Sequence, residues 1–205
     1  MSFLGRRCSG CVLVAFLAGA IAIGHAAEPA RTEPDFAWWR ELDLRDVDGA
    51  RVASDGRWLV LAFLDPDCPV ANAAVPVLNA LARGYRHQGV RVIGIYADPV
   101  LSVARVREHG REFSIGFPVL ADRQQRLVRL SGATYFSEVA VLDGRGVVLY
   151  CGRIDNRVGA DGATRPQATQ HDLASVLDRL VAGETGPFPS QPGFGCFLPA
   201  PVRAR

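Results

Sequence analysis

The sequence predicts an α/β fold with a central mixed sheet flanked by helices, and three observations support this prediction. The run from Trp58 to Leu64 is apolar almost throughout, which is typical of a strand buried on both faces. A second run of this kind spans Val90 to Ala97, and segments with the helical spacing of apolar residues follow both runs. Finally, Asp143-Gly-Arg-Gly146 separates two short apolar runs, which indicates a β-hairpin.

Cys68 stands between the first buried strand and the helix that follows it. Asp65-Pro66-Asp67 interrupts the apolar run, because a residue before proline is disfavoured in a helix. Cys68 then occupies the N-cap position, and Pro69 occupies the first helical position, which tolerates a missing N–H. Unpaired N–H groups and the helix dipole stabilise a thiolate at such a place. Asp65 and Asp67 oppose that effect if they lie close to the sulfur.

The elements after Cys68 follow from similar patterns. An apolar stripe predicts a helix that begins at Pro69 and ends before Gly89, which is placed as a C′ glycine. The members of this stripe are Val70, Ala74, Val77, Leu78 and Leu81. Further helices are expected over about 100–113, 124–130 and 170–182, a short strand over 117–120, and hairpin strands over 139–142 and 147–150.

The order of these elements determines the expected sheet. Two parallel strands joined by a helix require a right-handed crossover, and the hairpin adds two antiparallel strands. We therefore expect 58–64 to be the central strand, between 90–97 and 139–142, with 147–150 at an edge.

The last predicted helix lies between two long segments without regular periodicity. Thr169 and Asp172 have the spacing of a capping box at its start. Its buried stripe is predicted to be Leu173, Leu177, Leu180 and Val181. Before it, 155–168 forms a long polar and glycine-rich loop, which is either functional or mobile. After it, 184–205 is a proline-rich tail that contains Cys196.

Residues 1–26 are typical of a secretory signal peptide. The basic pair Arg6-Arg7 precedes an apolar stretch from Val12 to Ile23, and small residues follow at the expected cleavage site after Ala26 or Ala27. The stretch is short for a membrane span, so we expect a periplasmic or secreted protein with no membrane contact after cleavage. The remaining residues, 27–205, are predicted to form one domain with its core over about 40–183.

Signal cleavage lowers the number of cysteines in the mature protein. Cys8 and Cys11 have the spacing of a redox dithiol, but both precede the apolar stretch and are expected to be removed with it. Cys68, Cys151 and Cys196 remain. Because this number is odd, at most one intramolecular disulfide can form.

Composition excludes several classes of function. All 23 basic residues are arginine, so catalysis by a lysine nucleophile or Schiff base is excluded. Loss of Arg6 and Arg7 with the signal peptide leaves 21 basic and 21 acidic residues, and this balance argues against a nucleic-acid partner. His87, His109 and His171 lack the spacing of a metal site and are expected at exposed helix positions. We therefore expect no metal and no cofactor.

The segment around Cys68 resembles a known family. Phe63, Cys68-Pro69 and Pro76 are similar in spacing to the active-site helix of thioredoxin-like proteins. The pattern Asp67-Cys-Pro-Val-Ala-Asn72 resembles exported bacterial redoxin-domain proteins of the alkyl hydroperoxide reductase/thiol-specific antioxidant group. Later landmarks of that group recur as Glu138-Val-Ala-Val-Leu-Asp143, Tyr150, Gly152-Arg-Ile-Asp-Asn-Arg157 and Gly195-Cys196-Phe-Leu198.

This resemblance covers about residues 40–198 and implies a thioredoxin-like fold and thiol chemistry. It implies that Cys68 is the catalytic cysteine and that Cys196 is retained as its partner. The substrate-binding residues that it implies are Pro69, Asn72, Ser137 and Glu138. The expected reaction partners are a small disulfide, a hydroperoxide or an electron-donating protein. The oligomeric state does not follow from the sequence.

Several motifs of related proteins are absent. Ala71 stands where a thioredoxin dithiol has its second cysteine, so Cys68 has no partner in its own helix. Asp65 stands where a peroxiredoxin has a hydroxyl residue that binds peroxide, and Asn72 where a copper-delivery protein has its second cysteine. Ser137 replaces the usual cis-proline. A cis bond before serine costs about 3 kcal/mol more than before proline, so we expect a trans bond there.

Two functions are consistent with these residues. The first is an exported thiol oxidoreductase of the redoxin or antioxidant type, with Cys68 as the nucleophile in thiol–disulfide or peroxide chemistry. The second is a non-enzymatic binding or accessory domain in which Cys68 is structural. The missing second cysteine and the missing cis-proline favour this second function.

If Cys68 has an intramolecular partner, we expect it to be Cys196, which the family resemblance also retains; otherwise Cys68 is a monothiol. The twelve residues from Glu184 to Gly195 span about 40 Å when extended, so the tail can bring Cys196 back to Cys68. Such a pair is either a structural staple or a catalytic pair. Cys151 is expected on an edge strand, two strand spacings of about 4.8 Å each from the central strand, and should not reach Cys68.

Overall fold

The computed structural model describes residues 37–42, 44–52, 56–159 and 161–199. The predicted signal peptide, with Cys8 and Cys11, lies outside these residues, as do the residues that lead from it to Ala37. None of the helices in the described part of the chain combines the length and the apolar character that a membrane crossing requires.

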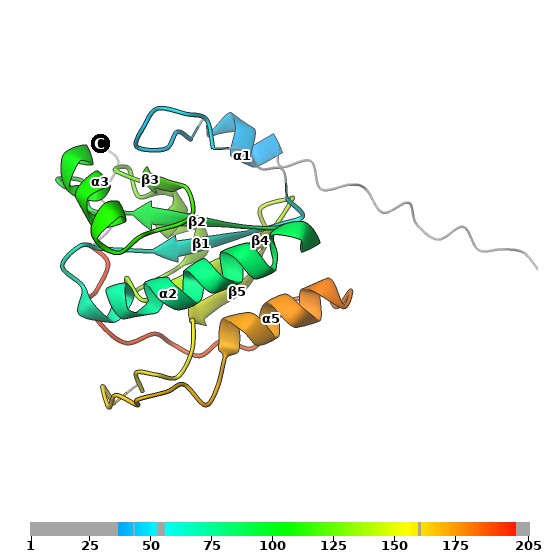
Figure 1. Cartoon of the computed structure of the whole chain (residues 1–205). Coiled ribbons are helices and arrows are strands. Elements are labelled where there is room, and N and C mark those ends of the chain that lie inside the picture. Colours follow the sequence, from blue (N-terminus) through cyan, green and yellow to red (C-terminus); the bar gives the residue numbers. More distant parts are fainter. Residues whose placement is uncertain (1–36, 43, 53–55, 160, 200–205) are drawn as a thin grey trace, which may run out of the picture. The chain divides into compact units, whose positions relative to one another are not determined.

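A five-stranded sheet with the order β3-β2-β1-β4-β5 forms the centre of the described structure (Figure 1). Its strands are β1 Trp58–Phe63, β2 Val90–Tyr96, β3 Val119–Ala121, β4 Glu138–Asp143 and β5 Val148–Arg153. β1 is parallel to β2 and antiparallel to β4, and β5 occupies an edge. The predicted central strand, its two neighbours and the edge position of the last strand are confirmed.

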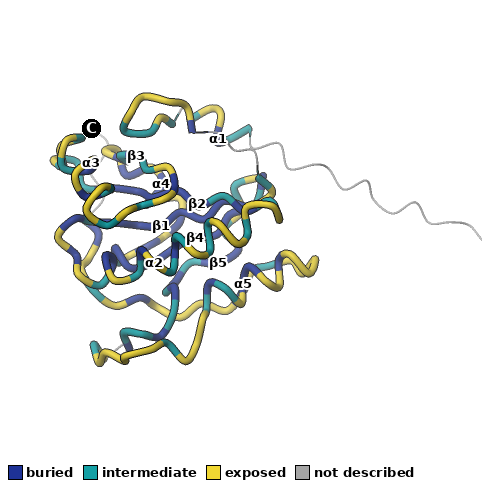
Figure 2. The backbone as a smooth tube through the Cα atoms, in the orientation of Figure 1, coloured by how far each residue is buried: buried dark blue, intermediate teal, exposed yellow. Residues whose placement is uncertain are grey.

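Helices flank this sheet, as the fold class predicts. They are α1 Ala37–Glu41, α2 Pro69–Gly84, the 3-10 helix η1 Arg86–Gln88, α3 Val103–Glu112, α4 Arg126–Ser131 and α5 Asp172–Val181. In Figure 1, α2 and α5 lie side by side in front of the sheet, and the hydroxyl of Tyr85 donates a hydrogen bond to Asp178 of α5. All residues of β1 are buried, as expected for a strand covered on both faces (Figure 2).

Helix α2 begins at Pro69 as predicted, but its buried face differs from the predicted stripe. The buried residues are Ala71, Asn72, Val75 and Leu78. Of the predicted stripe only Leu78 is among them, and Val70, Ala74, Val77 and Leu81 are partly buried. Apolar residues cover a broad arc of this helix, so the sequence pattern does not distinguish two adjacent stripes, and packing against the sheet selects one.

The start of α3 lies later than predicted because a side chain caps it. The hydroxyl of Ser102 accepts a hydrogen bond from the backbone N–H of Arg105 at 3.2 Å. Ser102 itself has extended backbone angles, so the helix begins at Val103. Serine is favoured at this position because it satisfies an N–H that has no partner within the helix.

The capping box predicted at the start of α5 is wrong. The N-cap is His171, without a side-chain capping bond. Thr169 pairs with Asn156 instead: its hydroxyl accepts from the Asn156 amide at 2.8 Å, and its N–H donates to Asn156 Oδ1 at 2.8 Å. This pairing ties the start of the long loop to the start of α5. The predicted stripe is also wrong at Val181, which is 37% exposed, while Val176 is buried.

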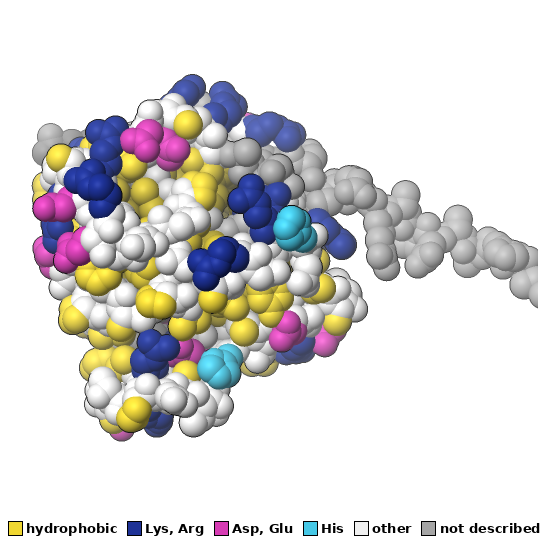
Figure 3. Space-filling view, in the orientation of Figure 1, with side chains coloured by type: hydrophobic (Ala, Val, Ile, Leu, Met, Phe, Trp, Pro, Cys, Tyr) yellow, Lys and Arg dark blue, Asp and Glu magenta, His cyan; other side chains and the backbone are white. Residues whose placement is uncertain are grey.

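Charged side chains of both signs occur together on the surface. The face in Figure 3 shows arginine side chains among Asp and Glu side chains. His87 and His171 are exposed, as predicted. The prediction is wrong for His109, which is 0% exposed. His109 lies three residues after Val106 and four before Phe113, so it shares the inner face of α3 with them.

Candidate active site

Cys68 lies at the end of the turn that joins β1 to α2. Within this turn the N–H of Asp67 donates to Asp65 Oδ1 at 2.8 Å, and the N–H of Cys68 donates to the Asp65 carbonyl at 3.2 Å. Cys68 is the N-cap of α2, with extended backbone angles and no side-chain capping bond. Its side chain is 0% exposed. The turn therefore holds a buried thiol at a helix N-terminus.

The two carboxylates near Cys68 lie in different environments. Burial raises the pKa of Asp65, which favours its neutral form. Asp67 is 87% exposed and lies 3.4 Å from the guanidinium of Arg105. Their combined opposition to a thiolate at Cys68 is weaker than two unpaired carboxylates would produce.

The C-terminal tail returns to this turn and packs against residues 134–138. We call residues 193–199 the tail strap. Before Cys196, the Gly193 N–H donates to Glu138 Oε1 at 2.8 Å, and Ser137 Oγ donates to the Phe194 carbonyl at 2.7 Å. At Cys196 itself, the carbonyl accepts from the Phe136 N–H at 3.0 Å. After Cys196, the Leu198 N–H donates to the Thr134 carbonyl at 2.8 Å. Tyr135 and Phe197 also form an antiparallel bridge. The strap is therefore tied down on both sides of Cys196.

The tail strap brings the thiol of Cys196 to the thiol of Cys68. The neighbouring thiol of Cys68, with a smaller contribution from burial, raises the pKa of Cys196 to about 11. Cys196 therefore keeps its proton at neutral pH. Cys196 is exposed whereas Cys68 is buried, so the pair has one outer and one inner sulfur. Both cysteines are free thiols in this structure.

Ser137 and Glu138 contact the tail strap. Ser137 holds the strap through the Phe194 carbonyl. The Glu138 carboxylate accepts the N–H groups of Thr134 at 2.7 Å, Tyr135 at 3.1 Å and Gly193 at 2.8 Å. Among the described peptide bonds the cis form occurs at Gly186–Pro187, so the bond before Ser137 is trans, as predicted.

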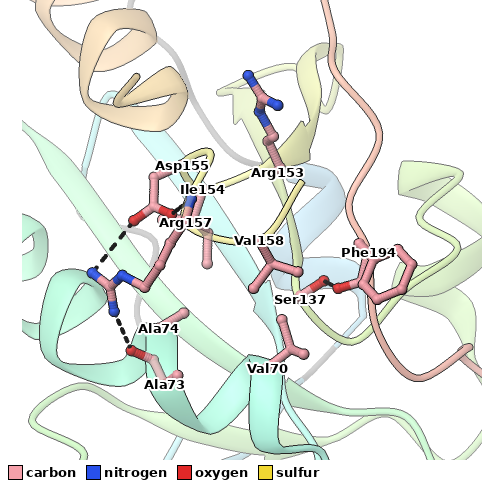
Figure 4. Close-up of a pocket in the computed structure, with 10 residues that line it drawn as sticks. All are labelled: Val70, Ala73, Ala74, Ser137, Arg153, Ile154, Asp155, Arg157, Val158 and Phe194. Atoms are coloured by element: carbon pink, nitrogen blue, oxygen red, sulfur yellow. Dashed lines mark hydrogen bonds and ion pairs between the residues drawn. The ribbon is translucent and has the colours of Figure 1, made fainter. Parts of the chain in front are cut away.

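A small pocket opens beside the tail strap (Figure 4). Its empty volume is about 380 Å³, and its wall is mostly apolar. The wall is formed by Val70, Ala73 and Ala74 of α2, Phe194 of the strap, Ser137, and residues 153–155, 157 and 158. The guanidinium of Arg157 spans one side, donating to the Ala73 carbonyl at 3.0 Å. Val70 lies two residues after Cys68 and Phe194 two residues before Cys196, so the pocket is lined by the neighbours of both cysteines.

Pro69 and Asn72, both predicted to bind substrate, lie in different environments. Pro69 is exposed at the first position of α2. Asn72 is buried, and its amide donates to the Pro66 carbonyl at 3.0 Å. Its Oδ1 faces His109 Nε2 at 2.8 Å. Both polar atoms of Asn72 are therefore engaged within the fold.

His109 was not among the predicted site residues, although its side chain contacts Asn72. The signal that could have identified it is the spacing from Val106 and Phe113, which places it on the inner face of α3. A histidine on a buried face requires polar partners. The partners come from α2 and β2, and the sequence does not show which side chains those elements present to α3.

Cys151 lies on β5, opposite Ala140 of β4. Burial, with a smaller effect of Glu138, raises the pKa of Cys151 to about 12. β4 lies between β5 and β1 in the sheet. Cys151 is therefore a protonated, half-buried thiol at neutral pH. Within the described residues, no group of three or more His, Cys, Asp or Glu side chains could hold a metal ion.

Comparisons with known proteins identify the family and the fold. The chain is 26% identical over 133 residues to the thiol-disulfide oxidoreductase ResA of Geobacillus thermodenitrificans, covering 63% of this chain and 68% of that protein. The structure matches that of a hypothetical protein from Sinorhizobium meliloti with a TM-score of 0.64 and 24% identity, over 76% of this chain and 88% of that one.

A protein from Chlorobium tepidum described as a thiol:disulfide interchange protein also shares the fold. Its TM-score is 0.51 at 19% identity, over 68% of this chain and 89% of that one. The thioredoxin-like fold is therefore established. The model of the AhpC/TSA family matches residues 30–151, which include Cys68 and end before the tail strap. The chain belongs to the AhpC/TSA family, whose redoxin members it was expected to resemble.

Proposed function

We propose that this protein is an exported thiol–disulfide oxidoreductase in which Cys68 and Cys196 alternate between a dithiol and a disulfide. The observation that supports this function is the approach of an exposed thiol on the tail strap to a buried thiol at a helix N-terminus. The similarity to ResA, named a thiol-disulfide oxidoreductase, supports the same reaction type. The signal-like pattern of residues 1–26 supports a periplasmic or secreted protein whose mature part, 27–205, is one redoxin domain.

Exchange with a partner takes place at Cys196, the exposed sulfur. In the oxidised protein, a thiolate of an electron-donating protein attacks Cys196, the S–S bond breaks, and Cys68 leaves as a thiolate. Unpaired N–H groups at the start of α2 stabilise this leaving group. A second thiol of the donor then attacks the mixed disulfide, so the donor leaves oxidised and Cys196 is released as a thiol. In the opposite direction Cys196 first loses its proton to water and attacks a small disulfide RSSR, which expels one RS⁻ and leaves a mixed disulfide on Cys196. Cys68 then attacks the Cys196 sulfur and expels the second RS⁻, so the protein ends as the Cys68–Cys196 disulfide.

The remaining predicted site residues have distinct roles in this proposal. Pro69 is exposed beside Cys68 and contacts the partner. The pocket along Val70 and Phe194 receives the group next to the reacting sulfur of the partner. Ser137 and Glu138 hold the strap, and thereby Cys196, in place for the partner. Asn72 holds the turn that carries Cys68.

Redox titration of the protein tests this function. The protein is equilibrated in glutathione buffers of graded potential, free thiols are alkylated, and disulfide-linked peptides are identified by mass spectrometry. We expect a reversible Cys68–Cys196 link in the wild type and none in Cys68→Ser or Cys196→Ser. Cys151→Ser is the matched control and should titrate like the wild type, since Cys151 lies on β5.

The same samples distinguish the alternative functions. If no Cys68–Cys196 peptide forms at any potential and the reduced protein reacts with neither a disulfide nor a hydroperoxide, Cys68 is structural and the protein is an accessory domain. If a hydroperoxide oxidises the pair much faster than oxidised glutathione does, the reaction is peroxide reduction instead. A link that forms but resists reduction throughout the range identifies a structural staple.

A further inference from the structure

Three buried polar side chains from three elements form a chain that ends at the turn of Cys68. The hydroxyl of Tyr96, at the end of β2, lies 2.6 Å from Nδ1 of His109 on α3. Nε2 of His109 lies 2.8 Å from Oδ1 of Asn72 on α2. Tyr96 is 1% exposed, His109 0% and Asn72 8%. Polar groups buried to this extent are costly unless every one is paired, so the chain is a constrained arrangement.

The donors and acceptors in this chain follow from its last link. The Asn72 amide nitrogen donates to the Pro66 carbonyl, which can only accept, so Oδ1 is the atom that faces His109. His109 Nε2 must then be the donor to Oδ1. Nδ1 is left to accept from the Tyr96 hydroxyl. One neutral tautomer of His109 satisfies all these bonds, and burial lowers the pKa of His109, which favours that neutral form.

Asn72 forms two hydrogen bonds to the turn. Its amide reaches the Pro66 carbonyl at 3.0 Å, and its backbone N–H donates to the Cys68 carbonyl at 3.0 Å. The other link from α3 to the turn is Arg105 to Asp67 at 3.4 Å, with side chains 33% and 87% exposed. Ion pairs between exposed side chains contribute little to folding stability. The buried link through His109 is therefore the stronger connection between α3 and the turn.

The geometry of this turn matters because a disulfide tolerates little displacement. Bonding requires Cα atoms within a narrow range of separation, and a displaced pair stores strain and becomes easier to reduce. The tail strap fixes Cys196 from one side, through residues 134–138. Nothing in the strap fixes the Pro66 carbonyl, which Asn72 and His109 hold from the other side.

We propose that His109 is a positioning residue for the redox pair: through Asn72 it holds the turn that sets the Cys68 sulfur opposite Cys196. This inference rests on the proposed function and adds to it a residue that touches neither sulfur. Its effect is expected on the stability of the disulfide relative to the dithiol. Loosening the turn lowers the effective concentration of one thiol at the other, so the equilibrium shifts towards the dithiol.

Substitutions at His109 test this role. His109→Leu removes the donor to Asn72, whereas the amide of His109→Gln can replace Nε2 as donor. With dithiothreitol as the reductant, His109→Leu should shift the dithiol–disulfide equilibrium constant about tenfold towards the dithiol, which is about 30 mV for a two-electron couple. His109→Gln should restore most of the wild-type value. A fold-stabilising role alone would not require the amide to rescue the equilibrium.

Asn79 provides the matched control. It also links α2 to the chain after α3, donating to the Ser114 carbonyl at 3.0 Å and accepting from Gly116 N–H at 2.8 Å, but it lies away from the turn. Asn79→Leu should lower the urea midpoint of unfolding and leave the equilibrium constant unchanged. If His109→Leu does not fold, Tyr96→Phe, which deletes only one hydroxyl, replaces it and should shift the constant in the same direction. An unchanged constant in every folded His109 or Tyr96 variant overturns the proposal.

A second measurement separates this inference from the proposed function. In a Cys196→Ser background no pair can form, and the rate at which iodoacetamide alkylates Cys68 reports how the turn holds a fully buried thiol. His109→Leu should raise that rate several-fold, and Asn79→Leu should not. If the wild type forms no Cys68–Cys196 disulfide, the proposed function fails, while this rate still decides the role of His109. Equal alkylation rates in Cys196→Ser with and without His109→Leu contradict the positioning role.

Discussion

At the scale of single residues, burial and partners decide what each thiol and imidazole can do. The three described cysteines are a buried thiol at a helix start, a thiol whose pKa is raised to about 12 by burial on β5, and an exposed thiol whose pKa is raised to about 11 by its neighbour. The residue type is the same in all three. The differences among the three cysteines therefore come from their surroundings, and so does the difference between the buried His109 and the exposed His87 and His171.

The titration of His109 leads to a prediction about stability and pH. Burial, and then the charge of Arg105, lowers the pKa of His109 below its ordinary value of 6.5. Between the lowered pKa of the folded state and the ordinary pKa of the unfolded chain, the unfolded chain binds more protons, so acidification favours unfolding. His109 should therefore contribute a loss of stability as the pH falls from about 7 to about 5.

His109→Gln cannot titrate and should lose less stability over that range. Urea unfolding of both proteins at several pH values measures the difference. Other groups contribute equally to both proteins, so the difference between the two slopes reports His109. Parallel slopes would show that His109 binds protons alike in the folded and unfolded states.

At the scale of elements, the tail strap determines where Cys196 lies. It contains no helix or strand of its own and pairs with residues 134–138 through hydrogen bonds and one isolated bridge. Glu138 is central to this pairing because its carboxylate accepts N–H groups on both sides, from Thr134, Tyr135 and Gly193. The space is tight as well: a Cβ at Gly193 would lie 2.6 Å from Glu138 Cγ.

Glu138→Gln should weaken the strap. The Gln amide would present N–H to backbone N–H groups and leave some of them unpaired, at a cost of about 1 kcal/mol or more. Disulfide closure by oxidised glutathione should slow about fivefold, in proportion to the lower occupancy of the docked strap.

Stopped alkylation and mass spectrometry give the closure rate. Glu184→Gln is the matched control, since Glu184 is exposed and pairs with Arg179 at 2.8 Å on the surface. That substitution should change neither closure nor stability measurably. A Glu138→Gln protein that closes at the wild-type rate would show that the strap is held without this carboxylate.

At the scale of the whole molecule, the proposed disulfide would connect two distant parts of the domain. Cys68 belongs to the first βα unit, and Cys196 follows the last helix. The cross-link would close a loop of 196 minus 68, or 128, residues. Such a loop restricts the unfolded chain, so redox state and global stability are linked.

The oxidised protein should therefore unfold at higher urea concentration than the reduced protein. The entropic model sets the difference at about 4 to 5 kcal/mol, less any strain in the folded state. Unfolding curves with and without reductant measure it. Cys196→Ser should abolish the difference, and Cys151→Ser should preserve it. A difference that persists in Cys196→Ser would assign the effect to another thiol.

The sequence by itself determined the features that depend on local pattern. The apolar run from Trp58 to Leu64, the Pro-Asp-Cys-Pro entry to α2 and the glycine-rich hairpin turn predict the central strand, the helix start and the edge strand. These predictions succeed because strand burial, proline restriction and turn geometry act over a few neighbouring residues.

Only the tertiary structure decided which side chains meet. The buried face of α2, the burial of His109 against Tyr96 and Asn72, and the docking of the strap on Glu138 join residues from separate elements. The chain length permitted Cys196 to reach Cys68, but length does not specify contact. The position of Cys196 follows from hydrogen bonds between the strap and residues 134–138, which join two segments far apart in the sequence.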